Sequence, residues 1–187
     1  MISMPVLETP RMLLRPAHPR MAGTVLEFYR RNARRLQQVE PRYPADYLTL
    51  ACQRQILRQE RVSARRGEGV RYWMFLREAP ERACGCVALN EIVYGAFRSC
   101  FIAYKTDGAL LRRGYGAEAV NAVVEFAFRG LQLHRIEANV LPRNEASLAL
   151  AKKCGFSEEG RSPEYLSING VWEEHIHMVR LNRALRP

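Results

Sequence analysis

The sequence lacks any apolar run long enough to cross a membrane. A transmembrane helix needs about 18 or more consecutive apolar residues, and no segment of the 187 residues approaches that length. The N-terminal segment MISMPVLETPRM also lacks the apolar stretch of a secretory signal. We therefore expect a cytoplasmic protein with no membrane partner.

The sequence has an odd number of cysteines, which argues against a disulfide framework. No export signal precedes them; the five residues are Cys52, Cys84, Cys86, Cys100 and Cys154. Cys84-Gly85-Cys86 has no second cysteine pair at zinc-site spacing. We interpret all five as small core residues. His175 and His177 share one face of a predicted strand without a well-spaced third ligand, so we interpret them as strand surface and predict no metal site.

Two common phosphate-binding motifs are also missing. The Walker pattern G-x-x-x-x-G-K-[ST] is absent, and the dinucleotide pattern G-x-G-x-x-G would need a third glycine where Ala119 stands. Neither motif therefore describes this chain.

What the sequence does contain is a glycine-rich turn between a strand and a helix. Ser99 to Lys105 reads as a strand, residues 106–111 as a loop, and Arg112-Arg113-Gly114-Tyr115-Gly116-Ala117 as the start of an amphipathic helix. Backbone N–H groups are free at a helix N-terminus, the dipole is positive there, and glycine permits close approach. These features suit a pyrophosphate. An ordinary turn with solvated arginines fits the same residues.

Composition and charge predict one globular domain, residues 1–187, with anionic partners. Hydrophobic residues make up 48% of the chain, and its formal net charge is +10. Such a charge favours coenzyme phosphates, nucleic acid or ribosome surfaces. Arginine-rich segments at 20–37 and 45–65 carry much of it. We interpret them as solvated helix faces and leave a ribosome or ribosomal RNA contact open.

The pattern of apolar residues and turn signals predicts an α+β (mixed α/β) chain. Helices are expected over 20–37, 45–65, 115–130 and 145–154, with Asn144 as the N-cap of the last. Strands are expected over 11–15, 70–77, 83–93, 98–105, 134–141, 164–168 and 171–181, with another strand start at Phe156 and a turn at 78–81. Asn169-Gly170 predicts the closing hairpin. A mixed, mostly antiparallel sheet of about seven strands flanked by about four helices follows.

Leu111 to Gly116 resembles the pyrophosphate loop Q/R-x-x-G-x-G/A of the GCN5-related N-acetyltransferases (GNAT), with Leu111 in place of the first Gln or Arg. The order of elements is also that of the GNAT fold. Leu7 to Arg15 resembles the L-x-T-x-R-x-x-L-R opening of the ribosomal-protein alanine N-acetyltransferase (RimJ/RimL-like) branch. Further matches to that branch are Glu118-Ala119, Leu133 to Val140, Asn144 to Ser147, Gly155-Phe156, Glu159-Gly160, Tyr165-Leu166, Asn169-Gly170 and Trp172.

The resemblance implies acetyl-CoA as cosubstrate and a set of residues that bind it. The pyrophosphate would lie on the backbone of Leu111, Arg112, Arg113, Gly114, Tyr115 and Gly116. Leu111 puts in doubt any side-chain contact from the first position. The pantetheine arm would pair with the strand edge at Ile102, Ala103 and Tyr104, which family members splay from the next strand. Asn144 is either a helix cap alone or also a contact to the pantetheine.

The resemblance also implies two catalytic residues. Glu164 would be the base for the acceptor amine, and Ser147 would protonate the leaving thiolate. From the residues alone, Glu164 reads equally as an exposed strand start after Pro163. Ser147 reads equally as the third residue of a capped helix.

The acceptor amine is left with three alternatives. The first is the N-terminal alanine of a ribosomal protein, which is the acceptor of the RimJ/RimL-like branch that the chain resembles. A small amine such as a drug, a polyamine or an amino acid is the second possibility, although the net positive charge disfavours polyamines. A non-catalytic module that binds coenzyme A or the ribosome is the third. Tyr94, Phe97 and Tyr104 either line the acceptor site or pack in the core, and core packing is the default. The sequence leaves monomer and homodimer both open.

Overall fold

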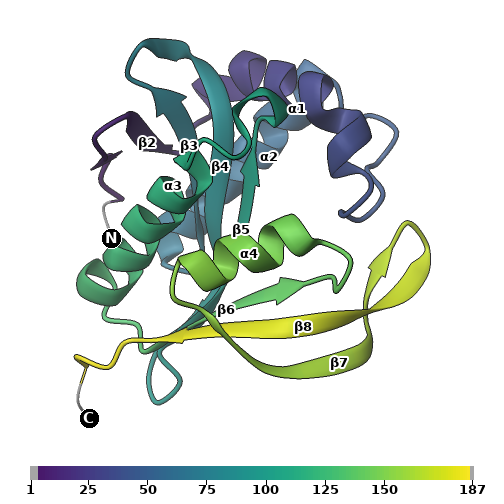
Figure 1. The fold of residues 1–187 in the computed structure, drawn as a ribbon. Helices are drawn as coiled ribbons and strands as arrows, with labels where there is room; N and C mark the ends of the chain where they lie inside the picture. The colour runs from purple at the N-terminus through teal and green to yellow at the C-terminus, as the bar shows by residue number, and fades with distance from the viewer. Residues whose placement is uncertain (1–3, 186–187) are drawn as a thin grey trace.

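One eight-stranded sheet organises the chain, in a computed structural model that describes residues 4–185 (Figure 1). The strand order across the sheet is β1-β2-β3-β4-β5-β6-β8-β7. The strands are β1 Leu7–Glu8, β2 Met12–Pro16, β3 Val70–Leu76, β4 Ala79–Val93, β5 Ser99–Thr106, β6 Arg135–Val140, β7 Ser157–Ile168 and β8 Val171–Leu181. The helices are α1 Ala22–Leu36, α2 Leu50–Arg66, α3 Tyr115–Glu125 and α4 Glu145–Lys153.

The predicted mixed, mostly antiparallel sheet is confirmed. Every neighbouring pair is antiparallel except β5 and β6, which run parallel. The additional strand is β1, a two-residue element whose Leu7 and Glu8 pair with Leu14 and Leu13. A two-residue strand is too short to produce an alternating pattern that sequence reading can detect.

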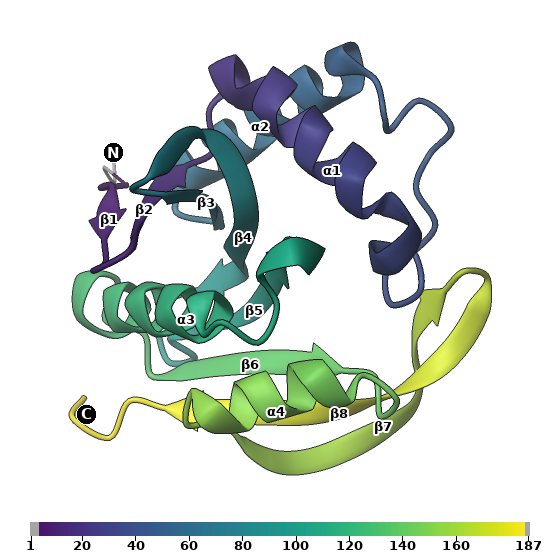
Figure 2. The same ribbon diagram turned by 45° about the horizontal axis from the view of Figure 1, so that its top comes forward.

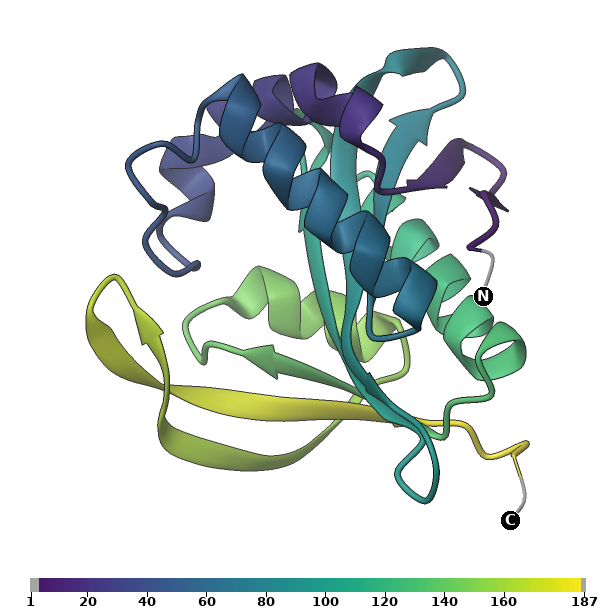
Figure 3. The ribbon, with the colours of Figure 1, turned by 180° about the vertical axis from the view of Figure 1, so that it is seen from behind.

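Helices cover both faces of the sheet, but not along its whole width (Figure 2). On the first face, α3 and α4 pack on alternate residues of β3 to β6 and β8, in one core that includes Val123, Ala151 and Ile136. On the second face, α1 and α2 pack on β3 and β4, in a core that includes Phe28, Leu57 and Trp73. Seen from behind, β7 and β8 extend beyond these two helices (Figure 3). The second face of β6 to β8 is therefore left without a helix.

Several predicted boundaries are wrong. Strand β7 runs from Ser157 to Ile168, so residues 164–168 are its end and not a separate strand. Helix α2 begins at Leu50 rather than 45, because Thr49 caps it by accepting a hydrogen bond from the Cys52 N–H at 3.2 Å, after a run of turns. Strand β4 begins at Ala79, inside the predicted turn, because a register shift near Phe75 pairs Leu76 with Ala79. Helix α3 matches its predicted start and continues into a π-helical turn, Phe126–Gly130.

The predicted core is mostly confirmed. Four cysteines are buried and all five are free, whereas Cys52 on α2 is partly exposed, contrary to its interpretation as core. Tyr94 and Phe97 are exposed where β4 turns into β5, so the expectation that they pack in the core is wrong. Within residues 4–185, no helix has both the length and the apolar character to cross a bilayer.

Gly85 lies at the centre of the sheet, where its close neighbours leave no room for a side chain. A Cβ at this position would lie 2.6 Å from Met74 Sδ and closer still to the Lys105 carbonyl oxygen. We expect Gly85→Ala to lower the free energy of unfolding by about 1–3 kcal/mol, because backbone in a central strand cannot move aside. Urea denaturation measures the change. Gly160→Ala is the control, since nothing lies within 4 Å of its added Cβ. An equal, small change in both variants would contradict the packing described here.

Candidate active site

A cleft of about 610 Å³ lies on the first face, between the start of α3 and α4. Its walls are mostly apolar, with charged side chains at Arg112, Glu145 and Lys153. The remaining lining residues are Thr106, Leu110, Leu111, Gly114, Gly116, Ala117, Ala146, Ala149 and Leu150. Four residues of the predicted pyrophosphate loop, Leu111, Arg112, Gly114 and Gly116, therefore lie in the cleft wall. The sequence reading placed Asn144 and Ser147 at the site but missed the α4 residues that line this wall, because contacts between separate helices leave no local pattern.

The start of α3 has the geometry of an anion site. Gly114 is the N-cap at φ +82°, a left-handed conformation that glycine adopts without strain, and no side chain caps the helix. Among the described residues, no group accepts a hydrogen bond from the N–H of Tyr115, Gly116 or Ala117. Such N–H groups point along the helix axis away from the helix, where the dipole adds positive potential. The backbone can thus receive a pyrophosphate without help from the Leu111 side chain.

Arg11 holds this turn from the side of the N-terminal strand. Its guanidinium pairs with Glu118 at 2.7 Å, donates to the Arg113 carbonyl at 3.0 Å and lies 4.1 Å from the centre of the Tyr115 ring. The Arg11 backbone N–H also donates to Glu118. Burial alone would raise the pKa of the Glu118 carboxyl, but the hydrogen bonds from Thr9 and Arg11 outweigh it and lower that pKa. The carboxylate stays charged and fixes the first turn of α3.

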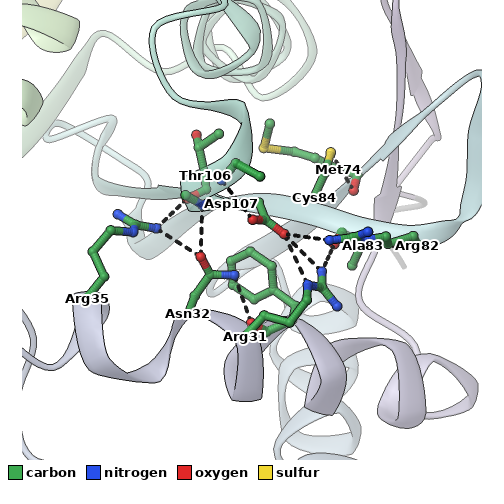
Figure 4. Close-up of polar contacts among 12 residues, drawn as sticks. Arg31, Asn32, Arg35, Met74, Arg82, Ala83, Cys84, Thr106 and Asp107 are labelled. Atoms are coloured by element: carbon green, nitrogen blue, oxygen red, sulfur yellow. Dashed lines mark hydrogen bonds and ion pairs between the residues drawn. The ribbon is translucent and has the colours of Figure 1, made fainter.

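Helix α1 holds the other end of the loop (Figure 4). Arg31 pairs with the buried carboxylate of Asp107 at 3.0 Å, and the Asn32 side chain accepts from the Gly108 N–H at 2.9 Å. Arg35 donates to the Thr106 carbonyl. Burial alone would raise the pKa of Asp107, but the Ala109 N–H and the Arg31 guanidinium outweigh it and hold that pKa below its ordinary value. Three α1 side chains thus fix three consecutive residues that lead into the cleft.

The predicted separation of two strands is present. Strand β5 pairs with β6 only from Ser99/Arg135 to Phe101/Glu137. Beyond Phe101, residues Ile102, Ala103 and Tyr104 are in register with β4 alone. One backbone edge of β5 is therefore open, as an extended amide-containing chain such as pantetheine requires.

Ser147 and Tyr104 meet beside this opening. The Tyr104 hydroxyl donates to the Ser147 carbonyl, and the Ser147 hydroxyl donates to the Tyr104 oxygen, both at 3.1 Å. Burial raises the pKa of Tyr104, so the phenol is protonated at neutral pH. Asn144 caps α4 by accepting from the Ser147 N–H at 3.2 Å. Asn144 and Ser147 therefore take the helix-capping positions that the sequence predicts. The Ser147 hydroxyl, paired with that of Tyr104, also places a proton donor at the start of α4.

Glu164 lies in an irregular stretch of β7. The register with β8 shifts between Ser162 and Leu166, and Glu164 has φ +51°. Its side chain is exposed. The exposure agrees with the strand-start interpretation, but the position does not, because β7 begins at Ser157 and Glu164 lies within it. The carboxylate therefore faces solvent, and any part in proton transfer takes place at the solvent boundary.

The two histidines of β8 differ from each other. His175 is buried, so its interpretation as strand surface is wrong; its ring centre lies 5.7 Å from that of Tyr165. His177 is mostly buried and forms hydrogen bonds with Glu137 and Ser162. Across residues 4–185, no group of three or more metal-ligating side chains is placed to hold an ion.

Comparison with known proteins identifies relatives over most of the chain. The family model for the acetyltransferase (GNAT) domain matches residues 11–157. "Probable N-acetyltransferase YjcK" of Bacillus subtilis is 39% identical over 137 residues, which cover 73% of this chain and 75% of that protein. The ribosomal protein uS5-alanine N-acetyltransferase of Escherichia coli is 27% identical over 177 residues, 91% of this chain and 87% of that one. The structure of ribosomal-protein-S5-alanine acetyltransferase from Vibrio fischeri matches with a TM-score of 0.92 at 27% identity, covering 98% and 100% of the two chains.

The turn at Gly114 generates a binding prediction. We expect Gly114→Val to weaken acetyl-CoA binding about tenfold or more, because a β-branched residue is strained in the left-handed conformation and its Cβ would lie 3.4 Å from Arg11 Nη2, so the turn that lines the cleft would shift. Isothermal titration calorimetry gives the dissociation constant. Gly170→Val is the matched control, since Gly170 has φ +87° but lies at the hairpin turn and not among the residues that line the cleft. Wild-type affinity in Gly114→Val would exclude this turn as the pyrophosphate site.

Proposed function

The chain belongs to the acetyltransferase (GNAT) family and is an acetyl-CoA-dependent N-acetyltransferase, and from this premise we propose that its acceptor is the α-amine of a protein N-terminus. In its most specific form, the proposal is that the acceptor is the N-terminal alanine of a ribosomal protein. The observation that carries this proposal is the similarity, over nearly the whole chain, to two enzymes named for alanine of ribosomal protein uS5, one matched in sequence and one in structure.

The chemistry of the acceptor supports the same choice. An α-amino group titrates near pH 8, so a useful fraction is uncharged at neutral pH, whereas a lysine side chain titrates near 10.4. An enzyme that takes α-amines therefore needs only modest help from a base. The net charge of +10 repels polycationic acceptors such as polyamines.

The proposed arrangement for acetyl-CoA follows the geometry of the cleft. The substrate supplies an activated acetyl thioester. The N–H groups at the start of α3 hold its pyrophosphate, with Arg112 and Arg113 close enough in sequence to add positive charge. The open edge of β5 at Ile102, Ala103 and Tyr104 holds the pantetheine and directs the thioester toward the second face of the sheet. Residues 1–187 act as one domain.

Two side chains take the proton-transfer roles in the proposal. An α-ammonium loses one proton before it attacks and a second as the amide forms, while the departing thiolate gains one. Glu164, exposed at the β7 irregularity, accepts the first proton at the solvent boundary. Ser147, backed by the neutral Tyr104 phenol, donates a proton to the thiolate. Asn144 orients Ser147 through its backbone.

The distribution of charge supports docking to the ribosome as part of this proposal. Arg30, Arg34, Arg54, Arg58, Arg65 and Arg66 are exposed on α1 and α2. A cationic surface of this kind attracts RNA phosphates in a salt-dependent manner.

The test of the proposed acceptor is a competition assay. Purified protein and acetyl-CoA are offered peptides that begin with alanine, the same peptides blocked at the N-terminus but containing lysine, and small amines including spermidine. We expect kcat/KM to be highest, by about tenfold or more, for free N-terminal alanine. A preference for a small amine would replace the proposal with its alternative. Absence of transfer to every amine, with normal acetyl-CoA binding, would favour a non-catalytic module.

The role of Glu164 is tested by Glu164→Gln. We expect kcat to fall at least about tenfold, with acetyl-CoA affinity unchanged, because the amide retains the shape of the side chain but accepts no proton. Steady-state kinetics and calorimetry measure the two quantities. Glu174→Gln is the control, since Glu174 is a second exposed carboxylate, on the neighbouring strand β8. Unchanged turnover in Glu164→Gln would remove this residue from the mechanism.

A further inference from the structure

A second polar cluster lies on the face of the sheet opposite the coenzyme cleft. Ile136, Ala138 and Val140 of β6 belong to the core under α3 and α4. Because side chains alternate along a strand, Glu137 and Asn139 face the other way. The cluster comprises Glu137 and Asn139 of β6, Ser162 and Tyr165 of β7, and His177 of β8.

Three members of this cluster form a hydrogen-bonded chain. His177 Nδ1 lies 2.7 Å from Glu137 Oε1, and His177 Nε2 lies 2.8 Å from Ser162 Oγ. An ionised carboxylate only accepts hydrogen bonds, so the tautomer that fits both contacts carries its proton on Nδ1 and its lone pair on Nε2. Ser162 then donates to Nε2. This order of hydroxyl, imidazole and carboxylate lets a proton pass from the hydroxyl to the imidazole while the carboxylate stabilises the resulting charge.

The cluster is adjacent to the point where β5 and β6 separate. Glu137 is in register with Phe101, the last pair between these strands, and Asn139 lies two residues beyond it, opposite His177 on β8. A pantetheine arm that enters between the strands from the first face emerges beside these side chains. Ala103 of β5, on the far side of the opening, is exposed. The position is therefore where an acetyl group and an acceptor nitrogen would meet.

Asn139 has an unused acceptor at this position. Its Nδ2 donates to the Tyr165 hydroxyl at 3.2 Å, whereas its Oδ1 is buried and has no hydrogen-bond partner among the described residues. A buried acceptor without a partner carries a free-energy cost that a bound donor removes. An amine N–H is such a donor.

From these observations we infer that Ser162, His177 and Glu137 form the proton relay for the second proton that the acceptor nitrogen loses, and that Asn139 Oδ1 orients the nitrogen. As the C–N bond forms and the C–S bond breaks, the N–H proton passes to Ser162 Oγ while the Ser162 proton passes to His177 Nε2. The imidazolium then returns its proton to solvent. Arg135 donates to the second Glu137 oxygen at 2.7 Å and so leaves the first for His177. The inference rests on the proposed acetyl transfer but requires only an amine acceptor, not a particular one.

The test compares His177→Gln, Glu137→Gln and the double variant with wild type, using the best amine from the competition assay. Glutamine in place of His177 keeps a hydrogen-bonding side chain but accepts no proton. We expect each single variant to lower kcat about 100-fold, with the acetyl-CoA dissociation constant unchanged. Because the residues act as one unit, the double variant should lose little more than His177→Gln alone. His134→Gln, a change at an exposed histidine just before β6, is the control.

A kcat within about twofold of wild type in His177→Gln would overturn the relay, as would losses in the two single variants that multiply in the double variant. Thermal unfolding of each variant identifies a loss caused by misfolding; for such a variant, Ser162→Ala replaces it and should lower kcat without lowering the melting temperature. Asn139→Leu should raise KM for the amine more than it lowers kcat, and an unchanged KM would remove Asn139 from the site. If wild type prefers a small amine, the acceptor proposal fails while the relay is still tested on that amine.

Discussion

The proposed active site depends on one constraint, the end of pairing between β5 and β6 after Phe101 and Glu137. Two parallel strands that stayed paired would close the sheet and leave no passage between its faces. Their separation leaves the β5 edge open, with the start of α3 and the cleft on one face and the polar cluster around His177 on the other. The two substrates of an acetyl transfer can therefore approach from opposite faces and meet within the sheet.

The turn that lines the cleft is held rigidly from two directions. Arg11 and Glu118 fix the first turn of α3, and Arg31, Asn32 and Arg35 fix the residues that precede it. The buried carboxylate of Asp107 has two cationic partners, Arg31 at 3.0 Å and Arg82 at 3.7 Å. Backbone N–H groups held in place before a ligand arrives lose little entropy when they bind it. The end of α1 also reaches the β7–β8 hairpin, where Asn169 donates to the Gln37 carbonyl at 2.7 Å, so one helix touches both sides of the site.

Local signals in the sequence predict most of the fold. The apolar period of α3, the glycines before it and Asn169-Gly170 each depend on neighbours within a few residues, and each predicts its element correctly. The β7 irregularity at Glu164 and the burial of His175 depend instead on pairing with other strands. The contacts Arg31–Asp107 and Glu137–His177 join residues 76 and 40 positions apart. No periodicity encodes such pairs, and for that reason sequence reading found the glycine-rich turn that lines the cleft but not its anchors or the second polar cluster.

We propose that backbone N–H groups at the start of α3 and along the open edge of β5 bind coenzyme A. Amide hydrogen exchange measured by NMR, with and without saturating coenzyme A, tests it most directly. We expect the coenzyme to slow exchange at residues 115–117 and at one or more of residues 102–104, while exchange in the hairpin turn at residues 169 and 170 stays unchanged. Unchanged exchange at both segments in the saturated protein would contradict it.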